Sequence, residues 1–384
     1  MPTEPAYRAD HVGSLLRPPE MLEARRDFDA GKITAEQLNE IANKWALEAI
    51  KVQKEAGVAI FTDGEYRRSW WAGAMKDSLD GLIPDPDPAP PSGSVATGHW
   101  KGGSSEMARE TLAEMTQGTW VAAAKLTKAR SLVGDEAAFL KKNAPGNFKI
   151  TLAAVSGRAS GWYKPGITDK FYPSVDDLSH ELMGFLNQEV HELIGMGASY
   201  IQLDSLRYTS WMVEYRRQAM IDQGIDLEKE LDQQIAWDNI CIEGARGTPG
   251  VVVGHHICRG NNRSAWSGEG GYDPVAEKLF NTMNVDRFLL EYDTERAGSF
   301  EPLRYMPKDK MVVLGLISSK LPQLEKKEDI LRRIEEASKY VAIENLAISP
   351  QCGFASTAPG NLLTWEDQRR KLELVAEVAQ EVWG

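Results

Sequence analysis

The feature that most constrains the fold is a repeated alternation of short β-branched runs with amphipathic helical segments of about ten to twenty residues. This alternation is typical of βα units built around a parallel sheet. The pattern gives about eight such units, and eight units in a chain of about 250 to 400 residues predict a TIM barrel. We therefore expect an α/β fold, a (β/α)8 barrel that forms a single domain over residues 1–384. The predicted strands are 9–15, 58–65, 148–155, 199–205, 250–258, 287–293, 311–319 and 346–352.

The helices between these strands carry recognisable end signals. Thr34 stands at an N-cap position with Gln37 three residues later, and Gly57 follows the last apolar position. Ser174 and Gly197 delimit a second helix in the same way. The pattern predicts helices at 34–57, 174–197, 227–246 and 327–341.

One stretch does not follow the pattern. Residues 80–105 read "DGLIPDPDPAPPSGSVATGHWKGGSS", and their density of Pro and Gly argues against a continuous helix or strand. We predict a long loop after the second strand, within an irregular insertion at about 80–130 that lies over the barrel mouth.

Charge and cysteine content exclude several function classes. The chain has 44 Lys+Arg against 56 Asp+Glu, and its net charge of −12 argues against a nucleic acid or an anionic membrane as partner. No run approaches the roughly 18 apolar residues that a membrane span needs. Three widely spaced cysteines do not form a disulfide framework and suit a reducing compartment. We expect a cytoplasmic protein with a small-molecule partner, and a homo-oligomer is compatible with the sequence.

The ends of the predicted strands are polar while their middles are apolar. In a TIM barrel the carboxyl ends of the strands line the active site, so these polar residues would meet at one mouth. They are His11, Ser14, Asp63, Glu65, Ser156, Asp204, His256, Cys258, Glu291, Asp293, Ser318, Lys320 and Cys352.

Four of these residues form a candidate metal set. His256 and Cys258 project to the same side of the fifth strand, Glu291 ends the sixth and Cys352 ends the eighth. Two thiolates, one imidazole and one carboxylate suit tetrahedral Zn²⁺. Sulfur-rich ligation favours binding of an incoming thiol as its thiolate, and a displaceable Glu291 would make room for it.

The other cysteine and the neighbouring histidine have simpler interpretations. Cys241 lies in a helical segment and is expected to be a small core residue. His255 points to the opposite face of the strand from His256 and is expected to be packed or hydrogen-bonded.

The motifs "HVGSLLRP", "TDGEYRR", "YIQLD", "GHHIC", "LLEYD", "GLISSK" and "SPQCGF" resemble, in order and spacing, those of the cobalamin-independent methionine synthase C-terminal barrel family. The resemblance covers nearly the whole chain. It implies a zinc in a TIM barrel that binds a thiol, typically homocysteine, which attacks an alkyl donor. It also implies the zinc ligands His256, Cys258, Glu291 and Cys352.

The resemblance further implies a substrate site. The backbone amides of Gly13 and Ser14 would hold the substrate carboxylate, and His11 belongs to the same motif. Glu65 and Asp204 would pair with the ammonium group, which is a suitable use for two carboxylates that face one cavity.

The chain departs from the family on the donor side. It is expected to be one of the short, single-barrel members, without the N-terminal half of the longer ones, and Ser205-Leu206 follow Asp204 where the family often has Glu-Pro. Lys320 stands near the place of a histidine that is thought to protonate the leaving group. Lys320, Asp204 or Glu65 could supply that proton here. The alkyl donor, methyltetrahydrofolate or another, therefore stays open.

We predict a zinc-dependent thiol S-alkyltransferase, with methylation of homocysteine as the first choice. Short members of the family include the epoxyalkane:coenzyme M transferases, so alkyl transfer to coenzyme M is an alternative. That reaction would require Arg67, Arg207, Arg259 or Lys320 to bind a sulfonate. A zinc-containing barrel that binds a thiol without turnover and a hydrolytic metal barrel are the remaining alternatives; hydrolytic sites favour two histidines where this chain has His256 and Cys258.

Overall fold

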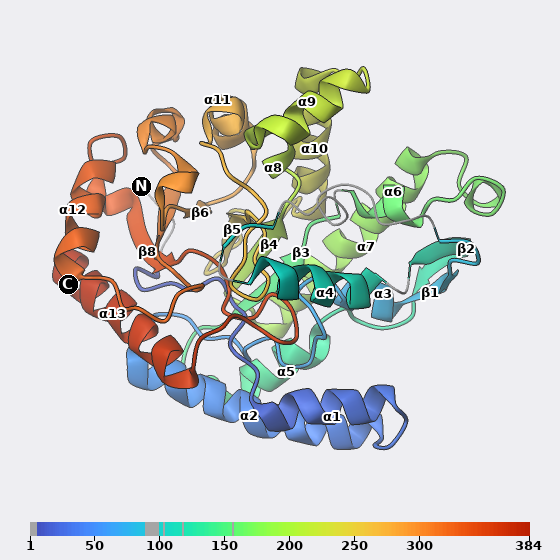
Figure 1. The fold of residues 1–384 in the computed structure, drawn as a ribbon, viewed down its shortest axis with the longest axis horizontal. Helices are drawn as coiled ribbons and strands as arrows, with labels where there is room; N and C mark the ends of the chain where they lie inside the picture. Colours follow the sequence, from blue (N-terminus) through green and yellow to red (C-terminus); the bar gives the residue numbers. More distant parts are fainter. Residues whose placement is uncertain (1–5, 89–99, 103, 117–118, 156) are drawn as a thin grey trace.

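Six parallel strands lie side by side in chain order at the centre of the molecule, with helices around them (Figure 1). The computed structural model describes residues 6–88, 100–102, 104–116, 119–155 and 157–384. The strands are β3 (Lys149–Ala153), β4 (Tyr200–Ser205), β5 (Val252–Ile257), β6 (Arg287–Glu291), β7 (Met311–Ile317) and β8 (Leu346–Pro350).

Two short extended segments link the edges of this sheet. Ala9 forms a parallel bridge with Ile348 of β8, and Phe61 forms one with Phe148, just ahead of β3. Between them, the N–H of Ala59 donates to the carbonyl of Ala9 at 2.9 Å. The hydrogen-bonded ring thus has eight members, as the TIM-barrel prediction requires.

The predicted strands at 9–15 and 58–65 are wrong in extent, because each pairs only through isolated bridges. The backbone explains why they are short. Gly13 has φ +140°, and Gly64 and Glu65 have φ +76° and +61°, so neither segment continues as a regular strand. These turns direct the residues that follow each bridge across the mouth of the barrel.

The predicted helix signals are confirmed. Thr34 and Gln37 form a reciprocal capping box on α2, and Gly57 ends that helix in the left-handed conformation. Ser174 caps α7, and Gly197 ends it. The helices are α1 (Pro19–Asp29), α2 (Ala35–Ala56), α3 (Ala74–Ser78), α4 (Ser105–Thr116), α5 (Gly134–Asn143), α6 (Arg158–Trp162), α7 (Val175–Met196), α8 (Thr209–Met212), α9 (Glu214–Asp222), α10 (Leu227–Cys241), α11 (Asp273–Thr282), α12 (Lys327–Ala337) and α13 (Trp365–Trp383).

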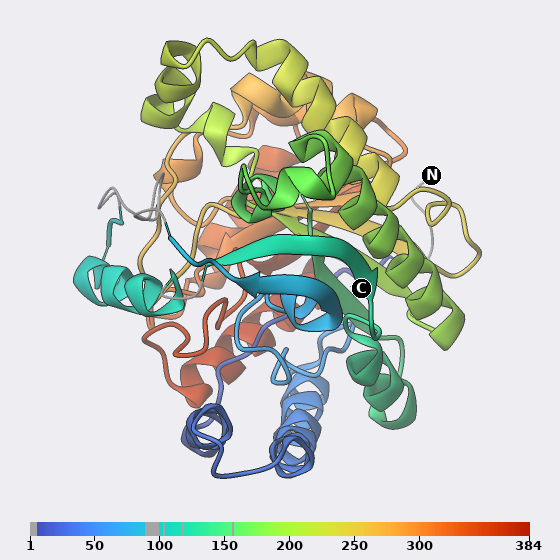
Figure 2. The same cartoon turned by 90° about the vertical axis from the view of Figure 1, so that its right-hand side faces the viewer.

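The insertion between the second segment and β3 contains regular structure, which corrects the prediction of a loop beginning at residue 80. The strand β1 (Leu79–Pro84) pairs antiparallel with β2 (Trp120–Lys128), and this ribbon faces the viewer in Figure 2. Residues 89–99 of the predicted loop lie outside the described part of the chain. Further along, Lys101 exchanges backbone hydrogen bonds with Trp266 in the loop after β5. This part of the insertion therefore does lie at the barrel mouth.

The interior of the barrel is more polar than the sequence suggested. Thr151 in β3 and Gln202 in β4 are buried polar residues, so the prediction of apolar strand middles is wrong there. Lys149 Nζ contacts Asp10 and Gln202, and the hydroxyl of Tyr200 donates to Asp10 at 3.0 Å. Buried polar groups persist only when they are hydrogen-bonded, and these are.

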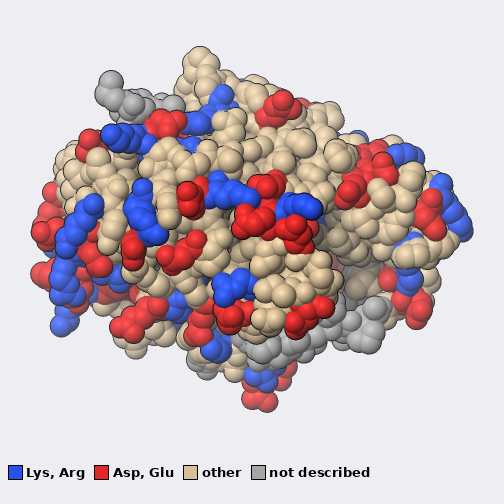
Figure 3. Space-filling model, turned by 90° about the horizontal axis from the view of Figure 1, so that it is seen from above, with Lys and Arg blue, Asp and Glu red and all other residues tan. Residues whose placement is uncertain are grey.

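Basic and acidic side chains are interspersed on the face seen in Figure 3, rather than gathered by sign. None of the helices in the described part of the chain is long and apolar enough to cross a membrane.

Candidate functional site

The four residues of the candidate metal set come together at the carboxyl ends of β5, β6 and β8. One donor atom from each of His256, Cys258, Glu291 and Cys352 lies within 4.8 Å of every other. The two sulfur atoms are 3.6 Å apart, well beyond the disulfide length of about 2.05 Å. Two sulfurs on a tetrahedral ion at about 2.3 Å would be separated by about 3.8 Å. The sulfur pair is therefore spaced for a shared metal ion.

His256 presents one ring nitrogen to this group. Its Nδ1 lies 3.2 Å from the carbonyl oxygen of Leu289, and because a carbonyl only accepts, Nδ1 carries the proton in the neutral ring. The lone pair is then on Nε2, which is buried without a hydrogen-bond partner among the described residues. Nε2 is therefore the ring nitrogen left for a metal ion, and binding of a cation would displace the proton from it.

Glu291 is fully buried and held from two sides. Its Oε1 accepts the backbone N–H of Arg259 at 2.7 Å, and its Oε2 accepts from Arg296 Nη2 at 2.6 Å. Asp293 Oδ1 pairs with the same Nη2 of Arg296, at 3.1 Å. Because Glu291 has these partners already, its carboxylate can leave a metal ion without becoming an unpaired buried charge.

The sulfur atoms differ in proton affinity. The hydrogen bond with Cys258 is the main cause that holds the pKa of Cys352 well below its usual range, against burial and with help from His256. The pKa of Cys258 is raised by the same pair interaction and by burial. Burial lowers the pKa of His256, but Cys352 and the charges of Asp204 and Glu291 outweigh it and raise that pKa to about 9. The neighbouring thiol and carboxylate charges thus favour a positive charge at this position.

Two carboxylates lie beside the sulfur and imidazole donor group. Asp204 ends β4 directly opposite His256 in the parallel register, and Glu65 follows the second extended segment. Burial raises the pKa of Asp204 to about 7, opposed by His256 and reinforced by the charge of Glu65. Burial also raises the pKa of Glu65, although Arg68 opposes it. A cation bound between these carboxylates would relieve their mutual repulsion.

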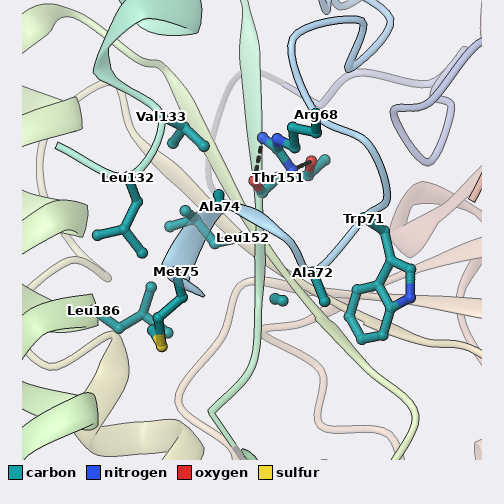
Figure 4. Close-up of a pocket in the computed structure, with 11 residues that line it drawn as sticks. Arg68, Trp71, Ala72, Ala74, Met75, Leu132, Val133, Thr151, Leu152 and Leu186 are labelled. Atoms are coloured by element: carbon teal, nitrogen blue, oxygen red, sulfur yellow. Dashed lines mark hydrogen bonds between the residues drawn. The ribbon is translucent and has the colours of Figure 1, made fainter. Parts of the chain in front are cut away.

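A network of hydrogen bonds orients Glu65. Thr151 Oγ1 donates to Glu65 Oε1 at 2.8 Å, and Arg68 Nη1 donates to that hydroxyl at 3.0 Å. Figure 4 shows the Arg68 guanidinium directed at Thr151 above a small cavity lined by apolar side chains. Glu136 accepts from Arg68 Nε and Nη2 at 2.7 and 2.6 Å.

The N-terminal motif lies between Glu65 and the segment that follows Cys352. A Cβ on Gly13 would be 2.8 Å from Glu65 Oε1, and the hydroxyl of Ser14 accepts the N–H of Ala355 at 3.4 Å. His11 is buried with Nε2 3.1 Å from the carbonyl of Ile60. Burial and the charge of Lys149 lower its pKa to about 4, so the ring is neutral.

Lys320 is the remaining predicted residue, and it is 4% exposed. Its Nζ has no hydrogen-bond partner among the described residues, and its charge helps to lower the pKa of Cys352. Two of the three arginines considered for a sulfonate are already paired, whereas Nε and Nη2 of Arg259 have no hydrogen-bond partner among the described residues. Arg67 pairs with Asp63, Arg207 pairs with Glu230 at 2.8 Å, and Arg259 stacks 4.5 Å over the ring of Tyr272.

Cys241 and His255, which are not assigned to the sulfur and imidazole group, behave as expected. Cys241 is completely buried in the core at the end of α10. His255 points away from the mouth, and its Nε2 is 3.2 Å from Asp238. Trp71 lines the small cavity of Figure 4, and Trp70 packs edge-on against it.

Sequence reasoning missed the residues that support the site. Thr151, Arg68, Glu136 and Gln202 were not singled out, yet Gln202 donates to Asp204 Oδ1 at 2.7 Å and the others orient Glu65. One signal was available: Thr151 and Gln202 are polar positions inside otherwise apolar strand runs.

The comparisons with known sequences and with solved structures agree with one another. The family described as cobalamin-independent synthase, catalytic domain, matches residues 174–381. The uncharacterised protein YxjH of Bacillus subtilis is 36% identical, over 98% of this chain and 95% of the relative. The methionine synthase of Saccharolobus solfataricus is 24% identical, over 89% of this chain and 86% of that protein. A Listeria monocytogenes structure, described provisionally as a vitamin-B12-independent methionine synthase, superposes with a TM-score of 0.69 at 26% identity and covers 98% of both chains.

Proposed function

We propose that this chain, which belongs to the cobalamin-independent synthase catalytic-domain family, is a zinc-dependent methyltransferase that methylates the sulfur of homocysteine. The methyltransferase class follows from the family; the metal, the thiol and the site residues are our proposal. The observation that carries it is the juxtaposition of a four-donor sulfur, nitrogen and carboxylate group with two buried carboxylates at one end of the barrel.

His256, Cys258, Glu291 and Cys352 are the residues that would hold the zinc ion. Their donor set, the sulfur spacing of 3.6 Å and the orphaned Nε2 of His256 fit that ion. When bound, zinc would supply the positive charge that keeps a thiol deprotonated at neutral pH. Arg296 and the backbone N–H of Arg259 would retain Glu291 when a substrate sulfur takes its place.

The polar end of homocysteine would be held on the opposite side of the cavity. Glu65 and Asp204 would bind the ammonium group, and the backbone of Gly13 and Ser14 would bind the carboxylate. His11 would support that segment as a neutral ring, through Ile60. Holding both ends makes attack of the sulfur on the methyl carbon effectively unimolecular.

The transfer itself is a substitution at the methyl carbon. The sulfur–carbon bond forms while the bond from that carbon to the leaving atom of the donor breaks, and the leaving atom takes up a proton. Lys320 is the proposed proton donor because its ammonium group is buried without a partner among the described residues, with Asp204 or Glu65 as the alternatives. Methyltetrahydrofolate is one donor that the reaction could use.

The test is a methyl-transfer assay on zinc-loaded protein that compares homocysteine with coenzyme M, each with a panel of methyl donors. We expect methionine as the product, and a decrease of about 10- to 100-fold in the Glu291→Gln variant because one ligand charge is lost. Glu295→Gln, an exposed acid in the next turn, is the matched control. Transfer to coenzyme M alone, or full activity in Glu291→Gln, would refute the proposal.

A further inference from the structure

Glu65 is fixed by one of its two oxygens only. Its Oε1 accepts the hydroxyl of Thr151 at 2.8 Å, whereas its Oε2 is buried and has no hydrogen-bond partner among the described residues. Glu65 is 4% exposed, so an unpartnered carboxylate oxygen there is costly. A partner that arrives with the substrate would remove this cost.

The direction of the Thr151 hydrogen bonds is determined by chemistry. Arg68 Nη1 lies 3.0 Å from Thr151 Oγ1, and a guanidinium can only donate. The single hydroxyl proton of Thr151 is therefore available for Glu65, which must accept it. This arrangement favours the ionised carboxylate and decides which of its oxygens is occupied.

Arg68 lies at the limit of ion-pair distance from Glu65 and does not hydrogen-bond to it. Its Nη1 is 4.0 Å from Glu65 Oε2, beyond hydrogen-bond distance. Glu136 takes Nε and Nη2 of the same guanidinium in a bidentate pair, and the carbonyl of Thr151 accepts a further bond from Nη2 at 2.8 Å. Figure 4 shows this guanidinium held against Thr151. The Arg68 charge thus lies near Glu65 without neutralising it through a hydrogen bond.

We infer that Thr151 is a positioning residue for substrate selection and that the Arg68–Glu136 pair keeps the Thr151 hydroxyl directed at Glu65. Together they leave Glu65 Oε2 as an acceptor for the primary ammonium group of an amino-acid thiol. The inference rests on the proposed function and makes it more specific, because it assigns the preference for amino-bearing thiols to residues that do not touch the substrate.

The experiment measures a selectivity ratio in zinc-loaded protein by calorimetry. The two ligands are homocysteine and 4-mercaptobutanoate, which differ only in the amino group. Thr151→Val keeps the side-chain shape but removes the hydroxyl, and Thr151→Ser restores it. Thr168→Val is the matched control, because Thr168 is also completely buried and its hydroxyl donates to the carbonyl of Ala122 at 2.9 Å, away from Glu65.

We expect the wild-type protein to prefer homocysteine and the Thr151→Val variant to lose about 10- to 100-fold of that preference, the range for one hydrogen bond to a charged group. The affinity for 4-mercaptobutanoate should change little. Thr151→Ser and Thr168→Val should keep the wild-type ratio. In Glu136→Gln the ratio should also fall, because Arg68 is released to pair with Glu65.

Two failures can be told apart. If the wild-type protein prefers homocysteine and folded Thr151→Val keeps the same ratio, the positioning role is wrong and the proposed function stands. If the wild-type protein does not distinguish the two thiols, the amino-acid substrate itself is wrong, and the inference is overturned with it.

Discussion

Replacement of Gly13 by alanine should disrupt the mouth of the barrel more than its small size suggests. Gly13 has φ +140°, a conformation that residues with a side chain rarely adopt. A Cβ there would lie 2.7 Å from Thr151 Cγ2 and 2.8 Å from Glu65 Oε1. Backbone strain of about 1–3 kcal/mol and a similar overpacking cost of about 1–3 kcal/mol together predict a loss of about 2–6 kcal/mol.

A second glycine separates these two contributions. Gly31 has φ +70° in the turn before α2, and a Cβ there would meet no atom within 4 Å. Gly31→Ala should therefore show backbone strain alone, about 1–2 kcal/mol. Denaturant midpoints of the two variants give the difference in their stability. Calorimetry with homocysteine should show a fall of at least about tenfold in affinity for Gly13→Ala only, because Glu65 must move to make room for the Cβ. The reasoning fails if Gly13→Ala is no less stable than Gly31→Ala or binds homocysteine like the wild type.

Three further perturbations test other parts of the site. Elemental analysis of protein purified without added metal should give near one zinc per chain. The zinc should be largely lost in Cys352→Ser and retained in Cys241→Ala, because only Cys352 of these two belongs to the donor group. Equal zinc content in both variants would remove Cys352 from the site. Lys320→Met should leave the denaturant midpoint unchanged or raised, because the substitution removes a buried charge that has no hydrogen-bond partner among the described residues. Turnover should fall by about tenfold or more. Unchanged turnover would exclude Lys320 as the proton donor. Burial, with the charge of Lys149, lowers the pKa of His11 from 6.5 to about 4, so His11 itself should contribute a loss of about 3 kcal/mol of stability as the pH falls through this interval, whereas the raised pKa of Asp204 contributes in the opposite direction. His11→Gln should flatten that dependence in urea titrations at several pH values, and an unaltered pH profile would contradict the buried neutral ring.

The barrel could be predicted because its signals are local. Each βα unit has its own apolar run and helix caps, and Thr34 and Ser174 cap helices where the sequence indicated. The lengths of the first two strands could not be predicted in this way. Their ends depend on positive φ angles at Gly13 and Gly64, and a glycine in an apolar run does not reveal which conformation it adopts.

The candidate metal group could be predicted because metal-binding residue types are rare and the barrel gathers strand ends in one place. His256, Cys258 and Cys352 were separated by up to 96 positions in the sequence, and their donor atoms lie within 4.8 Å of one another. The supporting residues had no such signal. Thr151 and Glu136 are common types whose role arises only when β3 and α5 place them around Arg68.

The two halves of the candidate site differ in how far the protein itself completes them. On the carboxylate side, Thr151, Arg68 and Gln202 hold Glu65 and Asp204 through protein hydrogen bonds, so this half is organised before any ligand arrives. On the sulfur side, Nε2 of His256 has no hydrogen-bond partner in the described part of the chain, and the two sulfurs lie 3.6 Å apart. A cation there would satisfy that nitrogen and offset the negative charge of the group. In the proposed function, recognition of the amino group would therefore depend on the fold, whereas activation of the thiol would depend on the ion, and variants of the two halves should fail in different steps.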